Sequence, residues 1–175
     1  QKYKKLDDEN IIEKWFSKES LENKIIQMED FKKSIKNDNK YKEVFLKDLE
    51  DKIEIAKKLK EKFDFSIISK MSIMNSHGDY SVQQLIYNNE KETSVIDFES
   101  AKRLPIMWEI IRSYTYIDKD IKNGEMNIDT FVEYVNEISK YVELNEFDLK
   151  YCAYIYLIQI IGSLYGYKQY NENYE

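Results

Sequence analysis

The chain has one cysteine, one histidine and one proline among its 175 residues. The single cysteine, Cys152, has no partner for an internal disulfide. Because it lies in an apolar helical run, we expect a buried and unreactive thiol. One histidine without a cysteine pair excludes a structural zinc site. The four glycines form neither a G-x-G-x-x-G phosphate loop nor a P-loop.

The chain also lacks a long apolar segment. The longest apolar run, Tyr151–Ile161, falls short of the roughly 20 residues that a membrane-spanning helix needs. The first ten residues, QKYKKLDDEN, contain no apolar core of the kind that a signal peptide carries. We therefore expect a cytoplasmic protein without a membrane partner. The chain begins with Gln1 rather than Met, which we interpret as a processed or truncated piece of a longer protein.

No excess of basic residues is present. Asp and Glu number 33 against 27 Lys and Arg, so the formal net charge is −6. This balance argues against a general nucleic-acid-binding protein, which normally presents a basic face. It is compatible with a cationic small-molecule substrate. The hydrophobic content of 42% is sufficient for a folded core.

Helical spacing of apolar residues dominates most of the chain. It predicts helices over residues 21–35 and 44–63, separated by a turn at Asn37-Asp38-Asn39. After Pro105, which we expect in a loop, the spacing predicts a helix over residues 106–117 in a segment closed by Asn123-Gly124. Asn127 or Asp129 is expected to cap the next helix, and Asn145 the last one. The middle of that last helix, which runs from Glu146 to about Leu164, is apolar all round, and this predicts a central buried helix followed by a loose tail rich in tyrosine.

One short β-hairpin interrupts the helices. Residues 85–87 and 93–96 are β-prone, and the polar residues 88–92 separate them. The predicted fold class is therefore mainly α with a small β-hairpin. Because a lone hairpin is not stable in water, it should pack on the helices.

The residues around this hairpin carry the chemistry. Asp79 follows His77 and Gly78 in a tight loop, and Asp97 ends the second β-prone run. Gln84 opens the hairpin, so that pairing of its strands would bring Asp97 back beside it. Glu99 would share the face of Asp97 if the strand continued. Carboxylate and amide oxygens are the ligands that Mg²⁺ accepts, and an isolated loop aspartate can orient and deprotonate a hydroxyl.

The order H-G-D, an amide residue five positions after the aspartate, an apolar β segment and then I-D-F-E resembles the C-terminal lobe of the aminoglycoside phosphotransferase and choline kinase family. These enzymes are small-molecule relatives of the protein kinases. The resemblance implies that residues 1–175 form one helical, kinase-like C-terminal lobe, with Asp79 as catalytic base and Asp97 as the Mg²⁺ ligand. It implies that Gln84 is a second metal ligand, that His77 braces the loop, and that Glu99 has a supporting role.

The same resemblance implies a transferase that moves the γ-phosphate of ATP or GTP to a hydroxyl of an aminoglycoside, choline or sugar-like molecule. Two positions depart from the family. Gln84 stands where asparagine is usual, and Glu109 stands one place later than a family aspartate whose buried structural part we expect it to take. No strand-rich nucleotide lobe precedes the helices, so we expect a fragment that is inactive alone. Arg112 is expected to form a salt bridge within the lobe.

Two other interpretations remain open. The substitution at Gln84 favours a non-catalytic kinase-like binding protein, such as a spore-coat or regulatory relative. Alternatively, the chain is an unrelated helical interaction domain in which the HGD and IDFE segments occur by chance. The positions of Asp79 and Asp97 in the fold distinguish this last interpretation from the other two.

Overall fold

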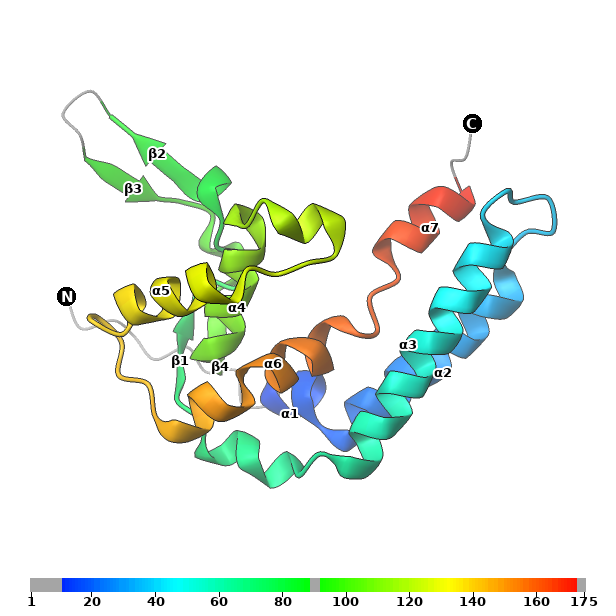
Figure 1. The fold of residues 1–175 in the computed structure, drawn as a ribbon, viewed down its shortest axis with the longest axis horizontal. Coiled ribbons are helices and arrows are strands. Elements are labelled where there is room, and N and C mark those ends of the chain that lie inside the picture. The colour runs from blue at the N-terminus through cyan, green and yellow to red at the C-terminus, as the bar shows by residue number, and fades with distance from the viewer. Residues whose placement is uncertain (1–10, 89–91, 173–175) are drawn as a thin grey trace. The chain divides into compact units, whose positions relative to one another are not determined.

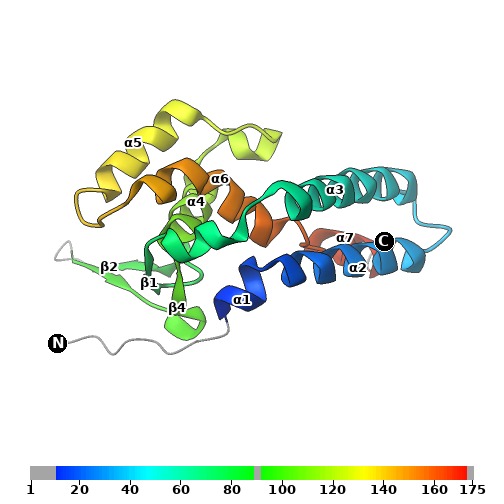
Figure 2. The ribbon, with the colours of Figure 1, turned by 90° about the horizontal axis from the view of Figure 1, so that it is seen from below.

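A computed structural model describes residues 11–88 and 92–172 (Figures 1 and 2). The chain forms two compact units. The first unit contains Ile67–Tyr156, and the second contains Ile12–Ser66 together with the chain from Leu157 onward. The mainly helical fold with a small β-hairpin, predicted from the sequence, is confirmed. Among the described residues, no helix is both long and apolar enough to cross a membrane.

The second unit is built from helices. Its elements are α1 (Ile11–Phe16), α2 (Lys18–Ser34), α3 (Lys42–Lys62) and α7 (Tyr165–Glu172), together with the end of α6 (Glu146–Ile160). Helices α2 and α3 pack side by side, as Figures 1 and 2 both show. The Ser17 side chain caps α2 by accepting a hydrogen bond from the Ser20 N–H at 2.9 Å. The fully buried core of this unit includes Phe16, Leu21, Met28, Leu49, Ala56 and Ile158.

The predicted turn at residues 37–39 is present, and it attaches α7. Asn39 is only 4% exposed, and its side-chain amide donates hydrogen bonds to the Asn171 side chain at 3.2 Å and the Tyr170 carbonyl at 3.3 Å. The expectation of a loose tail after Leu164 is therefore wrong. Paired amides and aromatic rings attach α7 to the turn. The helical spacing of apolar residues does not reveal such partners.

The first unit contains two small antiparallel sheets instead of the single hairpin expected. The predicted hairpin is present as β2 (Leu85–Tyr87) and β3 (Thr93–Val95), with Ile86 opposite Ser94. The second sheet pairs β1 (Ile73–Ser76) with β4 (Lys102–Pro105). Pro105 therefore ends a strand and does not lie in a loop. Pairing across this distance in sequence leaves no local pattern that would have predicted it.

Three helices complete the first unit. Helix α4 (Ile106–Ile117) has its predicted bounds and packs against β1 and β4. Helix α5 (Ile128–Ile138) is capped by Asn127, whose side chain accepts from the Thr130 N–H at 3.2 Å, so Asn127 and not Asp129 is the cap. Asn145 caps α6 as predicted, through the N–H groups of Phe147 and Asp148. However, α6 ends at Ile160 and leaves Leu149 (52%) and Tyr154 (45%) exposed, so it is not buried all round.

Candidate functional site

A buried glutamate of α4 holds the loop that follows β1. Glu109 is 8% exposed, and its two carboxylate oxygens accept hydrogen bonds from the N–H groups of Gly78 (2.7 Å) and Tyr80 (3.2 Å). Hydrogen bonds to a charged acceptor are among the stronger ones in proteins. The buried structural part expected for Glu109 is thus what the structure shows. It places the backbone on either side of Asp79 against the first turn of α4.

Gly78 allows this loop to approach a second segment closely. Its φ is +82°, a conformation that residues with a side chain rarely adopt. A Cβ atom here would overlap the carbonyl oxygen of Ser100 and lie 2.8 Å from its carbonyl carbon. The HGD loop is therefore in direct contact with the turn Phe98–Ser100, which follows Asp97.

His77 joins the same two segments. Its Nε2 atom lies 2.8 Å from the carbonyl oxygen of Ile96, and because a carbonyl only accepts, Nε2 is the donor. The imidazole also packs against Phe98, with ring centroids 4.6 Å apart. Nδ1 is buried without a hydrogen-bond partner among the described residues. This geometry fits the bracing role predicted for His77.

Asp97 has an unusual backbone. It is the only residue other than glycine in the described chain with a positive φ, at 66° with ψ at 55°. Asp97 lies beyond the end of β3 at Val95, directly before the turn Phe98–Ser100, and it is exposed. No ion pair in the described part of the chain involves Asp97. Backbone strain of this kind persists at functional sites when the surroundings enforce it.

Gln84 lies beside Asp97 at the base of the hairpin. Its backbone carbonyl accepts from the Ile96 N–H at 3.0 Å, one residue before Asp97. Its side-chain oxygen accepts a hydrogen bond from the Ser81 hydroxyl, and Ser81 is 6% exposed. The hairpin therefore places the backbone of Gln84 against the residue that precedes Asp97. Glu99 is different: the strand stops at Val95 and Glu99 lies in a 3-10 turn, so the condition under which it would share a face with Asp97 is not met.

Asp79 is paired with Arg112, for which the sequence predicted a salt bridge without identifying the partner. Its Oδ1 forms an ion pair with Arg112 of α4, whose side chain is 16% exposed against 46% for Asp79. The predicted salt bridge of Arg112 is thus confirmed, and its partner is the predicted base. Arg112 and Glu109 are three residues apart and share a helix face. This Glu-x-x-Arg spacing on one face was the available signal, and it acquires meaning only once the loop is known to lie on α4.

The two aspartates have different electrostatic surroundings. A guanidinium in contact with Asp79 repels a second cation, so Asp79 is unsuited to bind a metal ion. Among the described residues no ion pair involves Asp97, and its carboxylate and the side-chain oxygen of Gln84 are donors of the hard type that Mg²⁺ takes. In the described part of the chain, no three His, Cys, Asp or Glu side chains gather as a metal site. One or two carboxylates plus nucleotide phosphates are nevertheless the usual Mg²⁺ environment in phosphoryl transfer, so these residues fit the ion.

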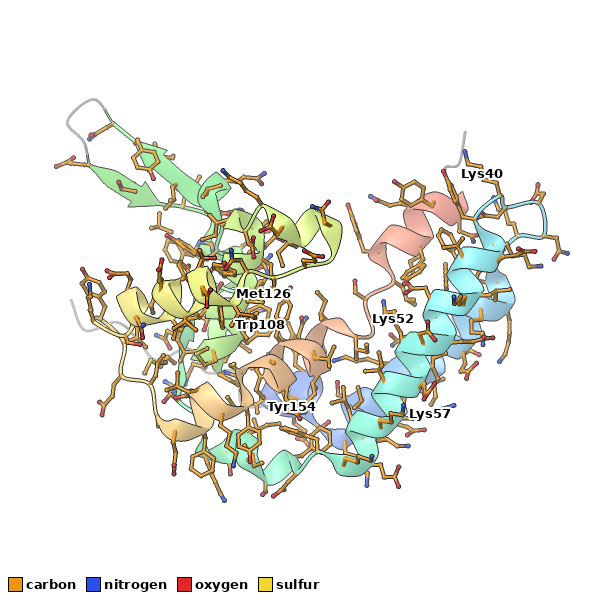
Figure 3. The ribbon with its side chains drawn as sticks, in the orientation of Figure 1. Lys40, Lys52, Lys57, Trp108, Met126 and Tyr154 are labelled. Atoms are coloured by element: carbon orange, nitrogen blue, oxygen red, sulfur yellow. The ribbon has the colours of Figure 1, made fainter. Side chains whose placement is uncertain are left out.

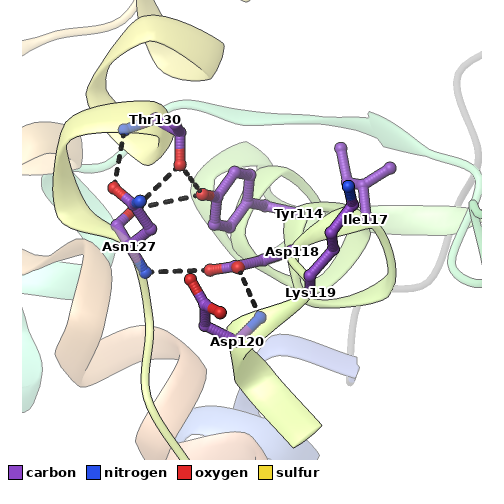
Figure 4. Close-up of a pocket in the computed structure, with 7 residues that line it drawn as sticks. All are labelled: Tyr114, Ile117, Asp118, Lys119, Asp120, Asn127 and Thr130. Carbon is purple, nitrogen blue, oxygen red and sulfur yellow. Dashed lines mark hydrogen bonds between the residues drawn. The ribbon is translucent and has the colours of Figure 1, made fainter.

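A small pocket of about 280 Å³ lies elsewhere in the first unit, at the end of α4 (Figure 4). It is lined by Tyr114, Ile117, Asp118, Lys119, Asp120, Asn127 and Thr130. Asp118 accepts from the N–H groups of Asp120 and Asn127, both at 2.9 Å, and these bonds lower the pKa of its carboxyl. Positions 112 and 114 point about 200° apart on a helix of 3.6 residues per turn. The pocket therefore belongs to a different face of α4 from Arg112.

Comparisons with family models, curated proteins and solved structures found no match to this chain.

Proposed function

We propose that this chain is the C-terminal, catalytic-loop lobe of a kinase-like phosphotransferase, which moves the γ-phosphate of ATP or GTP to a hydroxyl of a small molecule. Residues 1–175 would act together as this one lobe. The observation that carries it is the junction of the two acidic segments through His77, Gly78 and Phe98. If the HGD and IDFE segments occurred by chance, there would be no reason for a glycine and a histidine to hold the backbones of the two segments together.

The carboxylates of Asp79 and Asp97 would have different roles in the reaction. Asp79 would orient the acceptor hydroxyl and take its proton, while the hydroxyl oxygen bonds to the γ-phosphorus and the nucleoside diphosphate leaves with the electrons of the broken P–O bond. Asp97 and Gln84 would hold Mg²⁺, which when bound neutralises charge on the nucleotide phosphates. Glu109 and His77 would keep the parts in place, because catalysis of this reaction is mainly positioning.

The test uses the protein expressed from its full reading frame, with Mg²⁺ and either ATP or GTP. Asp79→Asn should lower turnover by about 10²- to 10⁴-fold, the usual contribution of a general base. Asp97→Asn should weaken the dependence on Mg²⁺. The control Glu133→Gln removes an exposed carboxylate on α5 and should leave turnover unchanged. Full turnover by Asp79→Asn would show that another group takes the proton.

A second function has support from two contacts. The Gln84 side-chain oxygen already accepts the Ser81 hydroxyl, and Oδ1 of Asp79 is engaged by Arg112. Both contacts favour a kinase-like binding protein that holds a nucleotide or small molecule without transferring phosphate. Nucleotide binding by the full-length protein, with no Mg²⁺-dependent release of ADP or GDP, would favour this function over the first.

A further inference from the structure

Arg112 is held from several directions at the position beside Asp79. Its guanidinium pairs with Oδ1 of Asp79 and donates to the Tyr116 hydroxyl at 3.2 Å and the Tyr80 carbonyl at 3.4 Å. The rings of Tyr116 and Trp108 lie 5.0 and 5.8 Å from its central carbon. A long flexible side chain is thus fixed in one place.

We propose that Arg112 is the positioning residue for the Asp79 carboxylate, an inference that rests on the proposed function. The guanidinium engages Oδ1, and no hydrogen bond within the described residues uses Oδ2. Oδ2 is then the atom that accepts the proton of the acceptor hydroxyl. Glu109 fixes the backbone on both sides of Asp79, and Arg112 fixes its side chain, so α4 controls both.

A positioning role and a purely structural salt bridge predict different effects when Arg112 is removed. Asp79 is half-exposed, and a surface ion pair contributes little to stability. Loss of orientation at a reacting group is more costly, because a misplacement of about 1 Å can lower a rate about 10²-fold. Removal of Arg112 should therefore lower kcat far more than it lowers the melting temperature. KM for MgATP should stay unchanged, because Arg112 makes no contact with Asp97 or Gln84 within the described residues.

The experiment measures Mg²⁺-dependent ATP hydrolysis, with water as the acceptor, by the protein expressed from its full reading frame. Arg112→Ala should lower kcat by about 10- to 100-fold, as the loss of an orienting partner does elsewhere. Arg112→Lys should recover only part of this loss, because an ammonium lacks the planar fork that reaches two acceptors. Added guanidinium ion should restore part of the Arg112→Ala rate. The matched control is Arg103→Ala, which also loses an arginine that binds a backbone carbonyl, that of Ile73 at 2.9 Å.

The outcomes separate this inference from the function on which it rests. A wild-type rate in Arg112→Ala, with Asp79→Asn inactive, would overturn the positioning role and leave the phosphotransferase proposal standing. A parallel loss of kcat and melting temperature without rescue by guanidinium would also overturn it, in favour of a structural role. Absence of Mg²⁺-dependent hydrolysis in the wild-type protein would overturn both. Adding Arg112→Ala to Asp79→Asn should cause no further loss, because both act through one carboxylate.

Discussion

Two residues of the candidate site have left-handed backbones, for different reasons. At Gly78 the left-handed backbone lies so close to Ser100 that any side chain would collide with it. At Asp97 a side chain is present in spite of the conformation. Glycine would adopt this φ at lower cost, so an aspartate at this position lowers stability. No ion pair among the described residues compensates for this loss. That cost is what we expect where a side chain is kept for function.

Substitution of Asp97 should separate backbone strain from chemistry. Asp97→Gly should be more stable than Asp97→Ala by about 1 kcal/mol, because only glycine relieves the left-handed conformation. Both variants should lose Mg²⁺-dependent activity, because both lack the carboxylate. Urea denaturation of the two variants measures the stability difference. Equal stability would show that the backbone at position 97 relaxes once the aspartate is removed.

At the scale of elements, one carboxylate connects the start of α6 to the start of β1. Asp148 is fully buried and accepts from the N–H groups of Asn145 (2.8 Å) and Ser72 (2.9 Å), and from the Ser72 hydroxyl (2.6 Å). With Asn145 at the cap, this is a reciprocal capping arrangement that also binds the neighbouring strand.

Asp148→Asn should destabilise the first unit by about 1–3 kcal/mol, because its amide nitrogen turns an acceptor into a donor opposite a buried N–H. Ser72→Ala removes only the hydroxyl bond and should cost about 0.5–1.5 kcal/mol. Thermal and urea unfolding of the two variants give the comparison. If Ser72→Ala proved as costly as Asp148→Asn, the contact with the strand rather than the cap would be the main contribution.

Local signals explain which elements the sequence predicted correctly. The bounds of α4, the turn before α3 and the caps at Asn127 and Asn145 each depend on residues only a few positions apart. The β1–β4 pairing and the Asp79–Arg112 ion pair join residues about 30 positions apart, for which one sequence offers no pattern. Within the site, Gln84 and Asp97 were placed together because a hairpin is local. The sequence did not predict which face of α4 contacts the HGD loop, because that face is set by the β1–β4 sheet, which was itself not predicted.

A half-buried lysine connects the ends of two helices in the second unit. Lys24 of α2 donates hydrogen bonds to the Ile158 carbonyl near the end of α6 (2.6 Å) and the Trp15 carbonyl near the end of α1 (3.2 Å). Burial lowers the pKa of Lys24 from 10.5 to about 8. Figure 3 shows Lys52, which reaches from α3 in a similar way, and its ammonium donates to the Ser163 carbonyl at 2.9 Å.

The lowered pKa of Lys24 predicts how stability depends on pH. Between about pH 8 and 10.5 the unfolded chain holds the Lys24 proton while the folded chain releases it. Stability from this group therefore rises with pH across that window, by at most about 1.4 kcal/mol per pH unit. The wild-type protein should gain stability relative to Lys24→Met as pH rises, whereas the exposed control Lys57→Met should run parallel to the wild type. Parallel curves for Lys24→Met would mean that Lys24 keeps its proton throughout this window.

At the scale of the whole molecule, apolar side chains are exposed around the candidate site. The β2–β3 hairpin projects away from the helices of its unit (Figure 1). Successive strand residues face opposite sides of a sheet, and Ile86 (51%) and Tyr87 (69%) are both exposed, as is Phe98 (58%) in the turn beyond β3. Both faces of the hairpin thus carry exposed apolar side chains. Under the proposed function, this is the surface that a nucleotide lobe would cover.

This exposure predicts weak nucleotide binding by the 175-residue chain alone. Tight small-molecule sites enclose most of their ligand, whereas the carboxylate of Asp97 and the rings around it face solvent. We expect a Kd for MgATP of about 1 mM or weaker, which corresponds to no more than about 4 kcal/mol of binding free energy. Calorimetric titration of this chain, with Asp97→Asn as the control, measures it. A micromolar Kd that is lost in Asp97→Asn would mean that the chain forms a complete nucleotide site by itself, and the exposed hairpin would then need another explanation.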